Sequence, residues 1–108
     1  MVHRYPKDRY YNDVSAEDAQ PALDLLVPMT RSAMTTPTRY AGWKDYGIPL
    51  TYIKCLKDTA VVKSMWDEYA TRAKEAGVQM DEIELDTSHS PFWSNPDALL
   101  EVLKKVIG

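Results

Sequence analysis

Hydrophobic and polar positions follow strand and helix periods most clearly in the second half of the chain. Short apolar and β-branched runs predict strands over residues 49–55 and 78–85. Hydrophobic positions at helical spacing predict amphipathic helices over residues 62–76 and 96–107. The residues expected to face inward are Met65, Trp66, Tyr69, Ala70, Ala73 and Ala76 in the first helix, and Leu99, Leu100, Leu103, Val106 and Ile107 in the second.

Residues at the ends of these two helices support the same boundaries. Gly77 is placed to end the first helix, because glycine readily adopts the left-handed conformation that follows a helix. Asn95 is the predicted N-cap of the second helix, with Pro96 in its first turn.

The order strand, helix, strand, helix implies a right-handed crossover and two parallel strands. Parallel sheets need both faces covered and are rarely built from two strands. The sequence therefore predicts an α/β fold that forms the end of a larger sheet. Either a further segment supplies the rest, or the chain self-associates through its open sheet edge.

The first half of the chain has weaker periodicity. MVHRYPKDRYYND reads as a loop or arm, and a helix is predicted from Ser15, with Asp18 completing a capping box and Pro21 kinking or restarting it. Residues 28–47 are expected to hold one or two short helices, with Met29, Ala33, Met34, Tyr40 and Trp43 facing inward. We therefore divide the chain into an arm and helical segment, residues 1–47, and a strand–helix–strand–helix core, residues 48–108.

Composition excludes several classes of protein. The net charge of -3, with 44% hydrophobic and 27% charged residues, is typical of a globular domain and offers no basic face for nucleic acid or anionic membranes. No apolar run approaches the length of a membrane span, and the N-terminal residues, His3 among them, do not resemble a secretory signal. Cys55 is the only cysteine, and no cluster has metal-site spacing. We expect a cytoplasmic protein with no metal and no cofactor.

Two ionisable residues follow the predicted strands, at the carboxyl ends where open α/β sheets bind their ligands. Asp58 follows the first strand and His89 follows the second, so one crossover should bring both to the same rim of the sheet. A carboxylate there can hold an imidazole in the required tautomer and stabilise its charged form, as in a nucleophilic triad.

Each of these residues also has a structural interpretation. His89 could be a histidine satisfied by the hydroxyls of Ser88 or Ser90, and Asp58 could be a solvated turn acid. Asp86 is the rival partner for the imidazole. Cys55 is interpreted as a small core residue, since nothing nearby in the sequence indicates an activated thiol.

Three segments, YNDVSAEDA, IPLTYIKCLKDTAV and SHSPFWSNPDALLEVL, together resemble the C-terminal part of the α/β-hydrolase fold. They are most similar to its fungal and plant esterase-like branch, which includes methyl-ester hydrolases and hydroxynitrile lyases. The resemblance runs from about Tyr11 to the end of the chain. It implies that Asp58 is the triad acid, that His89 is the triad base, and that the helices before Pro49 are the end of the lid domain.

The resemblance also implies a substrate pocket for a small, apolar, ester-like molecule. Phe92 and Trp93 could wall that pocket or pack against the last helix, and Met34 and Trp43 could line it from the lid or form the lid's own core.

The family's nucleophile lies in a G-x-S-x-G elbow, and the 108 residues contain no such motif. We therefore expect a hydrolase segment that acts on an ester or related acyl bond only together with an N-terminal part. The alternatives are a non-catalytic truncated homologue that binds partners through its edge strand at Ile53, and a lyase or cyclase on the same scaffold. A small anion-binding module would need a glycine-rich phosphate loop, which the sequence does not have.

Overall fold

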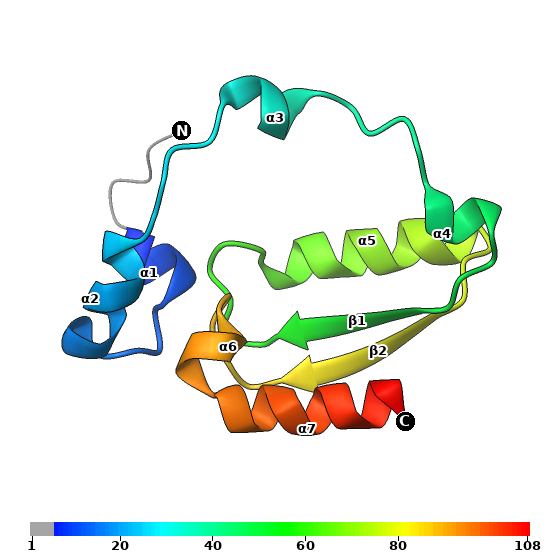
Figure 1. Ribbon diagram of the computed structural model, residues 1–108. Helices are drawn as coiled ribbons and strands as arrows, with labels where there is room; N and C mark the ends of the chain where they lie inside the picture. The colour runs from blue at the N-terminus through cyan, green and yellow to red at the C-terminus, as the bar shows by residue number, and fades with distance from the viewer. Residues whose placement is uncertain (1–5) are drawn as a thin grey trace.

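The computed structural model describes residues 6–108, so His3 lies outside the described residues. The elements are, in chain order, α1 (Pro6–Tyr10), α2 (Ala16–Asp24), α3 (Arg31–Thr35), α4 (Gly42–Asp45), β1 (Leu50–Cys55), α5 (Lys63–Glu75), β2 (Met80–Leu85), α6 (Pro91–Ser94) and α7 (Pro96–Ile107) (Figure 1).

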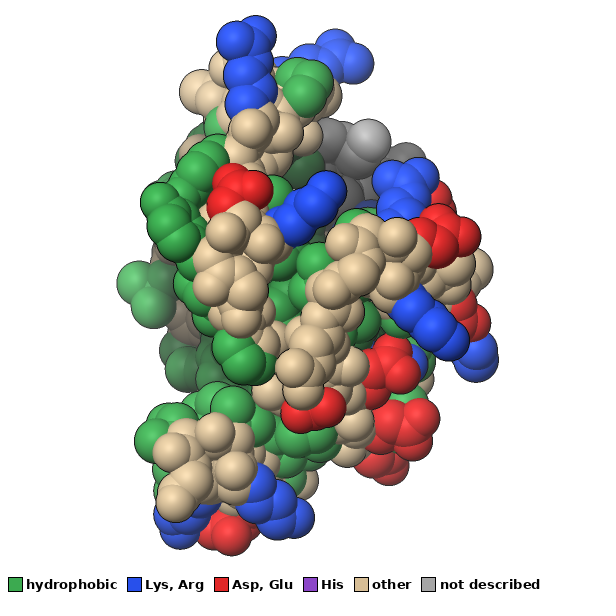
Figure 2. Space-filling model, turned by 90° about the vertical axis from the view of Figure 1, so that its right-hand side faces the viewer, with side chains coloured by type: hydrophobic (Ala, Val, Ile, Leu, Met, Phe, Trp, Pro, Cys, Tyr) green, Lys and Arg blue, Asp and Glu red, His purple; other side chains and the backbone are tan. Residues whose placement is uncertain are grey.

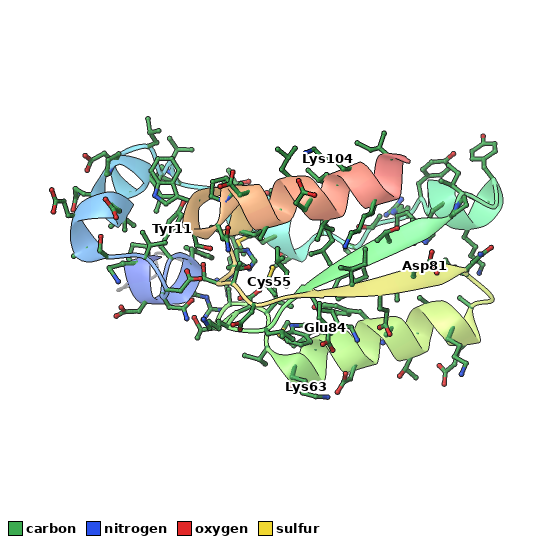
Figure 3. All side chains as sticks on the ribbon, turned by 90° about the horizontal axis from the view of Figure 1, so that it is seen from below. Tyr11, Cys55, Lys63, Asp81, Glu84 and Lys104 are labelled. Carbon is green, nitrogen blue, oxygen red and sulfur yellow. The ribbon has the colours of Figure 1, made fainter. Side chains whose placement is uncertain are left out.

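β1 and β2 form a parallel two-stranded sheet. Their register runs from Leu50 opposite Met80 to Cys55 opposite Leu85. Helices α5 and α7 lie on opposite faces of the strands in both ribbon views (Figures 1 and 3). The predicted strands, the two long helices and the parallel pairing are therefore confirmed, and the chain has the mixed helix and strand composition expected of an α/β-hydrolase segment.

The predicted helix ends are also confirmed. Gly77 has φ 72°, and the N–H groups of Gly77 and Val78 donate to the carbonyls of Lys74 and Ala73, which makes a Schellman motif after α5. Asn95 Oδ1 accepts from the N–H of Ala98 at 3.2 Å and caps α7.

Helix α2 begins at its predicted cap and continues through its proline. The Ser15 hydroxyl accepts from the N–H of Asp18 at 3.1 Å, and the helix runs unbroken across Pro21 to Asp24. Of the two outcomes expected at Pro21, a kink or a restart, the restart is therefore wrong. The proline removes one donor, but the rest of the helix keeps its ladder and buries Ala19 and Ala22.

The described part of the N-terminal arm, from Pro6 onward, is more ordered than its sequence predicts. Residues Pro6–Tyr10 form α1, where a proline at the first position has the φ that a helix requires. A helix of five residues is too short to show a hydrophobic period, which explains why the sequence pattern missed it. Tyr11 follows α1 and packs in a small core with Ala19 and Ala22 of α2 (Figure 3).

Several hydrophobic residues that were expected to face inward are exposed. In α5, Trp66 is buried but Tyr69 is exposed, as is Ala76 just after the helix. In α7, Val102 is buried, whereas Leu100, Leu103, Val106 and Ile107 are exposed. Two strands give a surface too narrow to cover the whole apolar face of either helix. Exposed apolar faces of this extent are typical of surfaces that another part of a protein covers.

The connection from α2 to β1 crosses the molecule as a thin span that carries α3 and α4 (Figure 1). Two short helices form there, as predicted, but the expected inward packing is wrong, because Met29, Ala33, Met34, Tyr40 and Trp43 are all exposed. Hydrophobic side chains gather along one border of the face shown in Figure 2, while most of the acidic ones lie toward the opposite border. The residues of α3 and α4 form no core of their own in the described part of the chain.

Among residues 6–108, no helix combines the length and the apolar character needed to cross a lipid bilayer.

Trp66 is the most substantial anchor of α5. Its side chain is buried and its indole N–H donates to the carbonyl of Val61 at 2.6 Å. Trp66→Phe, which keeps an aromatic ring but removes the donor, is expected to lower the free energy of unfolding by about 1–3 kcal/mol in urea titrations. Tyr69→Phe in the same helix should change it by less than about 0.5 kcal/mol, since Tyr69 is exposed. An equal effect of both changes would contradict the anchoring role of Trp66.

Candidate active site

The strand order brings two loops to one end of the sheet. Both strands point toward the side of the molecule that carries α1, α2 and α6 (Figure 1). The loop after β1 contains Asp58, and the loop after β2 contains His89. A backbone hydrogen bond joins the two loops directly, since the N–H of Lys57 donates to the carbonyl of Thr87 at 2.9 Å.

Asp58 is held by its own turn. One carboxylate oxygen, Oδ1, accepts from the N–H groups of Ala60 at 2.7 Å and Val61 at 2.9 Å. The side chain is only 7% exposed, so this carboxylate has little freedom to reorient. Its second oxygen, Oδ2, lies 2.8 Å from Nδ1 of His89.

His89 is paired through Nδ1 and remains partly exposed. Its side chain is 39% exposed, and its ring lies 5.4 Å from the ring of Tyr10, measured between centroids. When Nδ1 donates a hydrogen bond to the Asp58 carboxylate, the basic lone pair of the neutral imidazole is on Nε2. The arrangement can therefore take up a proton at Nε2 and stabilise the imidazolium that results.

Ser88 and Ser90, the serines on either side of His89, form hydrogen bonds with groups other than the imidazole. Ser88 is fully buried, and its hydroxyl lies 3.4 Å from the carbonyl of Tyr10. The N–H of Ser90 donates to that same Ser88 hydroxyl at 3.4 Å. The structure thus brings His89 to a carboxylate rather than to the hydroxyls that its structural interpretation invoked.

The rival acid lies apart from the imidazole. Asp86 is exposed and forms a 3.4 Å ion pair with Lys57. Of the two candidate acids, the structure brings Asp58 to the histidine.

The four residues predicted to border a pocket are not brought together. Trp93 is 40% exposed and its indole N–H donates to the carbonyl of Asp18 at 2.8 Å, which ties α6 to α2. Phe92 is more exposed. Met34 is in α3, and Trp43 is in α4 at the amino end of β1, the end opposite to His89 (Figure 1). Of these four residues, only Phe92 and Trp93 lie close to His89 in sequence.

Cys55 ends β1 and does not have the character of a nucleophile. Burial raises the pKa of its thiol, and the charges of Asp58 and Asp13 raise it further against a hydrogen bond with Thr87 that lowers it. A raised pKa keeps the thiol protonated at neutral pH and therefore unreactive. No group of three or more metal-ligand side chains occurs within residues 6–108.

Asp13 is a site residue that sequence reasoning missed. Its Oδ2 accepts from the N–H of Ser88, the residue before His89, at 2.8 Å. Partial burial raises the pKa of the Asp13 carboxyl, but hydrogen bonds with Ser88, Ser94 and its own backbone together outweigh this and hold the pKa below its ordinary value. The contact spans 75 positions of the chain, so no local pattern indicates it.

The lowered pKa of Asp13 predicts a pH dependence of stability. A carboxyl whose pKa is lower in the folded state stabilises the fold above its ordinary pKa of about 3.9, and that stabilisation is lost as the pH falls through the lower, folded value. Asp13→Asn is therefore expected to reduce the free energy of unfolding at pH 6 and to have a smaller effect near pH 3. Urea titrations of both proteins at these pH values test this, and a difference that stays constant with pH would contradict it.

No family model matches the chain, but two curated fungal hydrolases are similar to it. One relative is the alpha/beta hydrolase nvfD of Aspergillus novofumigatus, which is 29% identical over 102 residues. Another is the probable hydrolase R7 of a Phoma species, which is 32% identical over 98 residues. These similarities confirm the resemblance to fungal α/β-hydrolases.

The similarity covers this chain almost completely but the relatives only in part. The matched region is 94% of this chain and 39% of nvfD, and it is 90% of this chain and 39% of R7. The chain thus spans about two-fifths of the length of the curated relatives that it matches.

Proposed function

We propose that these 108 residues are the histidine- and acid-bearing part of an α/β-hydrolase that cleaves an ester or related acyl bond. The observation that carries the proposal is the 2.8 Å contact between Asp58 Oδ2 and His89 Nδ1, at the carboxyl ends of two parallel strands. The names of the two fungal relatives support it.

In the proposed reaction, His89 is the general base and then the general acid. Nε2 takes the proton of a serine hydroxyl as that oxygen attacks the acyl carbon, and it later gives the proton to the leaving alkoxide. Water then attacks the acyl-enzyme, again with His89 as base, and the acid product leaves. Asp58 stabilises the imidazolium throughout and is itself fixed by the N–H groups of Ala60 and Val61.

The serine and the oxyanion donors are proposed to lie outside these residues. The G-x-S-x-G elbow is absent from the printed sequence, and the chain matches only 39% of either relative. Under this proposal, α3 and α4 are the end of a lid, and Met34 and Trp43 contact the substrate or the remaining sheet once that part is present.

The two sheet edges differ in a way that suggests where the rest of the sheet joins. β2 has exposed acids at Asp81, Glu82 and Glu84, which is typical of an edge strand that avoids further pairing (Figure 3). Of the residues of β1, only Thr51 is exposed. We therefore propose that the missing strands continue beside β1.

The test isolates the protein from its source with an antibody raised against residues 63–75 and measures native and denatured masses. We expect a G-x-S-x-G elbow, either in the same polypeptide or in one that co-purifies in fixed ratio. A 12.3 kDa species alone, as a monomer or a self-paired dimer, would contradict the catalytic proposal. It would favour the alternative of a non-catalytic interaction module, in which Ile53→Lys in β1 would abolish partner binding and His89→Ala would not.

A further inference from the structure

The segment of residues 8–13 contacts both loops of the Asp58–His89 pair, although it lies far from them in sequence. On the side of the acid loop, the Thr59 hydroxyl lies 2.7 Å from the carbonyl of Asp8 and 3.1 Å from that of Arg9. The Asn12 amide donates to the carbonyl of Lys57 at 2.9 Å. Lys57 and Thr59 flank Asp58, so both sides of the acid are tied to this segment.

The same segment holds the histidine loop. The Asp13 carboxylate accepts from the N–H of Ser88, and the Ser88 hydroxyl lies 3.4 Å from the carbonyl of Tyr10. The ring of Tyr10 lies at 5.4 Å and tilted by 50° to the ring of His89. Ser88 is fully buried, so its N–H would have to find another acceptor if the Asp13 carboxylate were removed.

We infer that residues 8–13 form a positioning segment for His89, with Asp13 as its main positioning residue. The inference rests on the proposed function, since it concerns the histidine assigned there as the base. Catalytic side chains must be held close to the productive geometry, and a partly exposed imidazole needs fixed neighbours for that. The Asp13 carboxylate fixes the peptide unit that precedes His89, and a charged acceptor makes this bond stronger than a neutral one would.

The segment also makes the two loops depend on one another. One short stretch of chain bonds to the acid loop through Asn12 and to the histidine loop through Asp13. Release of either bond is therefore expected to loosen the contact between Asp58 and His89 without any change in those two residues.

The test is nuclear magnetic resonance of the 108-residue chain with ¹⁵N-labelled histidine. His3→Gln serves as the background, so that only His89 contributes. We expect a downfield Nδ1 proton signal from His89, since Nδ1 donates to the Asp58 carboxylate. Asp13→Ala is expected to speed exchange of that proton with water by about tenfold, which corresponds to ~1.4 kcal/mol. Asp13→Asn keeps an acceptor oxygen and should restore most of the protection.

The matched control is Asp24→Ala, which removes a carboxylate that accepts from the side chain of Gln20 at 2.7 Å in α2. It should leave the His89 signal unchanged. Backbone amide exchange in α7 reports global stability in each variant, so that a general loosening of the fold can be separated from a local effect.

Two outcomes would overturn the positioning role while leaving the proposed function intact. One is a His89 signal in the His3→Gln background that Asp13→Ala does not alter. The other is a change in exchange that α7 shows to the same extent. Absence of the Nδ1 signal in the His3→Gln background itself would be a different result, because it would contradict the Asp58–His89 pair and the proposed function with it.

Discussion

Replacement of His89 by alanine is expected to lower the rate of ester hydrolysis by the proposed complete hydrolase by about 10⁴-fold or more. In the proposed reaction the imidazole accepts the proton of the nucleophile and later protonates the leaving group, and no other histidine lies within the described residues. The measurement is kcat/KM with p-nitrophenyl butyrate for the wild-type and His89→Ala proteins. The loss should appear in kcat, since the imidazole acts in the transition state rather than in substrate binding.

Assembly and folding provide the control for this change. His89 is partly exposed, so the His89→Ala protein should keep the circular dichroism spectrum and native mass of the wild type. A variant that retains both properties and loses less than about tenfold in kcat would show that His89 is not the general base.

Replacement of Asp58 by asparagine is expected to have the second largest effect, about 10⁴-fold in kcat. The asparagine carbonyl can still accept from Ala60 and Val61, so its amide group would face Nδ1 of His89. An amide donor there favours the tautomer that carries its proton on Nε2, and this tautomer cannot take the proton of a serine. The measurement is the same ester assay, with kcat compared at saturating substrate.

Asp86→Asn is the matched control for the acid. It makes the same chemical change in the neighbouring loop, at an exposed residue whose partner is Lys57. Its kcat should lie within about threefold of the wild-type value, as for a surface substitution. If Asp86→Asn were as damaging as Asp58→Asn, the assignment of the triad acid to Asp58 would be wrong.

The main strands and helices could be predicted because the sequence patterns that indicate them are local. The caps of Ser15 and Asn95 and the C-terminal glycine Gly77 each act within one turn of their helix, and all three form as expected. The meeting of Asp58 with His89 was predictable as well, because parallel strands place their carboxyl ends at one edge.

The contacts that hold the histidine loop could not be predicted in this way. Asp13 and Ser88 meet across 75 positions, and neither belongs to a motif that indicates the other. The exposure of Met34, Trp43 and the outer face of α7 has a related cause. A hydrophobic period shows which side of a helix is apolar, but it does not show whether the neighbour that covers this side is present.

Labelling with a fluorophosphonate probe tests the proposed active site most directly. The protein isolated through residues 63–75 would be treated with a biotinylated fluorophosphonate, and the modified residue would be located by mass spectrometry. The proposal predicts one labelled serine, in a G-x-S-x-G elbow outside the 108 residues, with labelling slowed strongly by His89→Ala. Absence of labelling, or labelling that is equally fast without the imidazole, would contradict the assignment of His89 and Asp58 to a working triad.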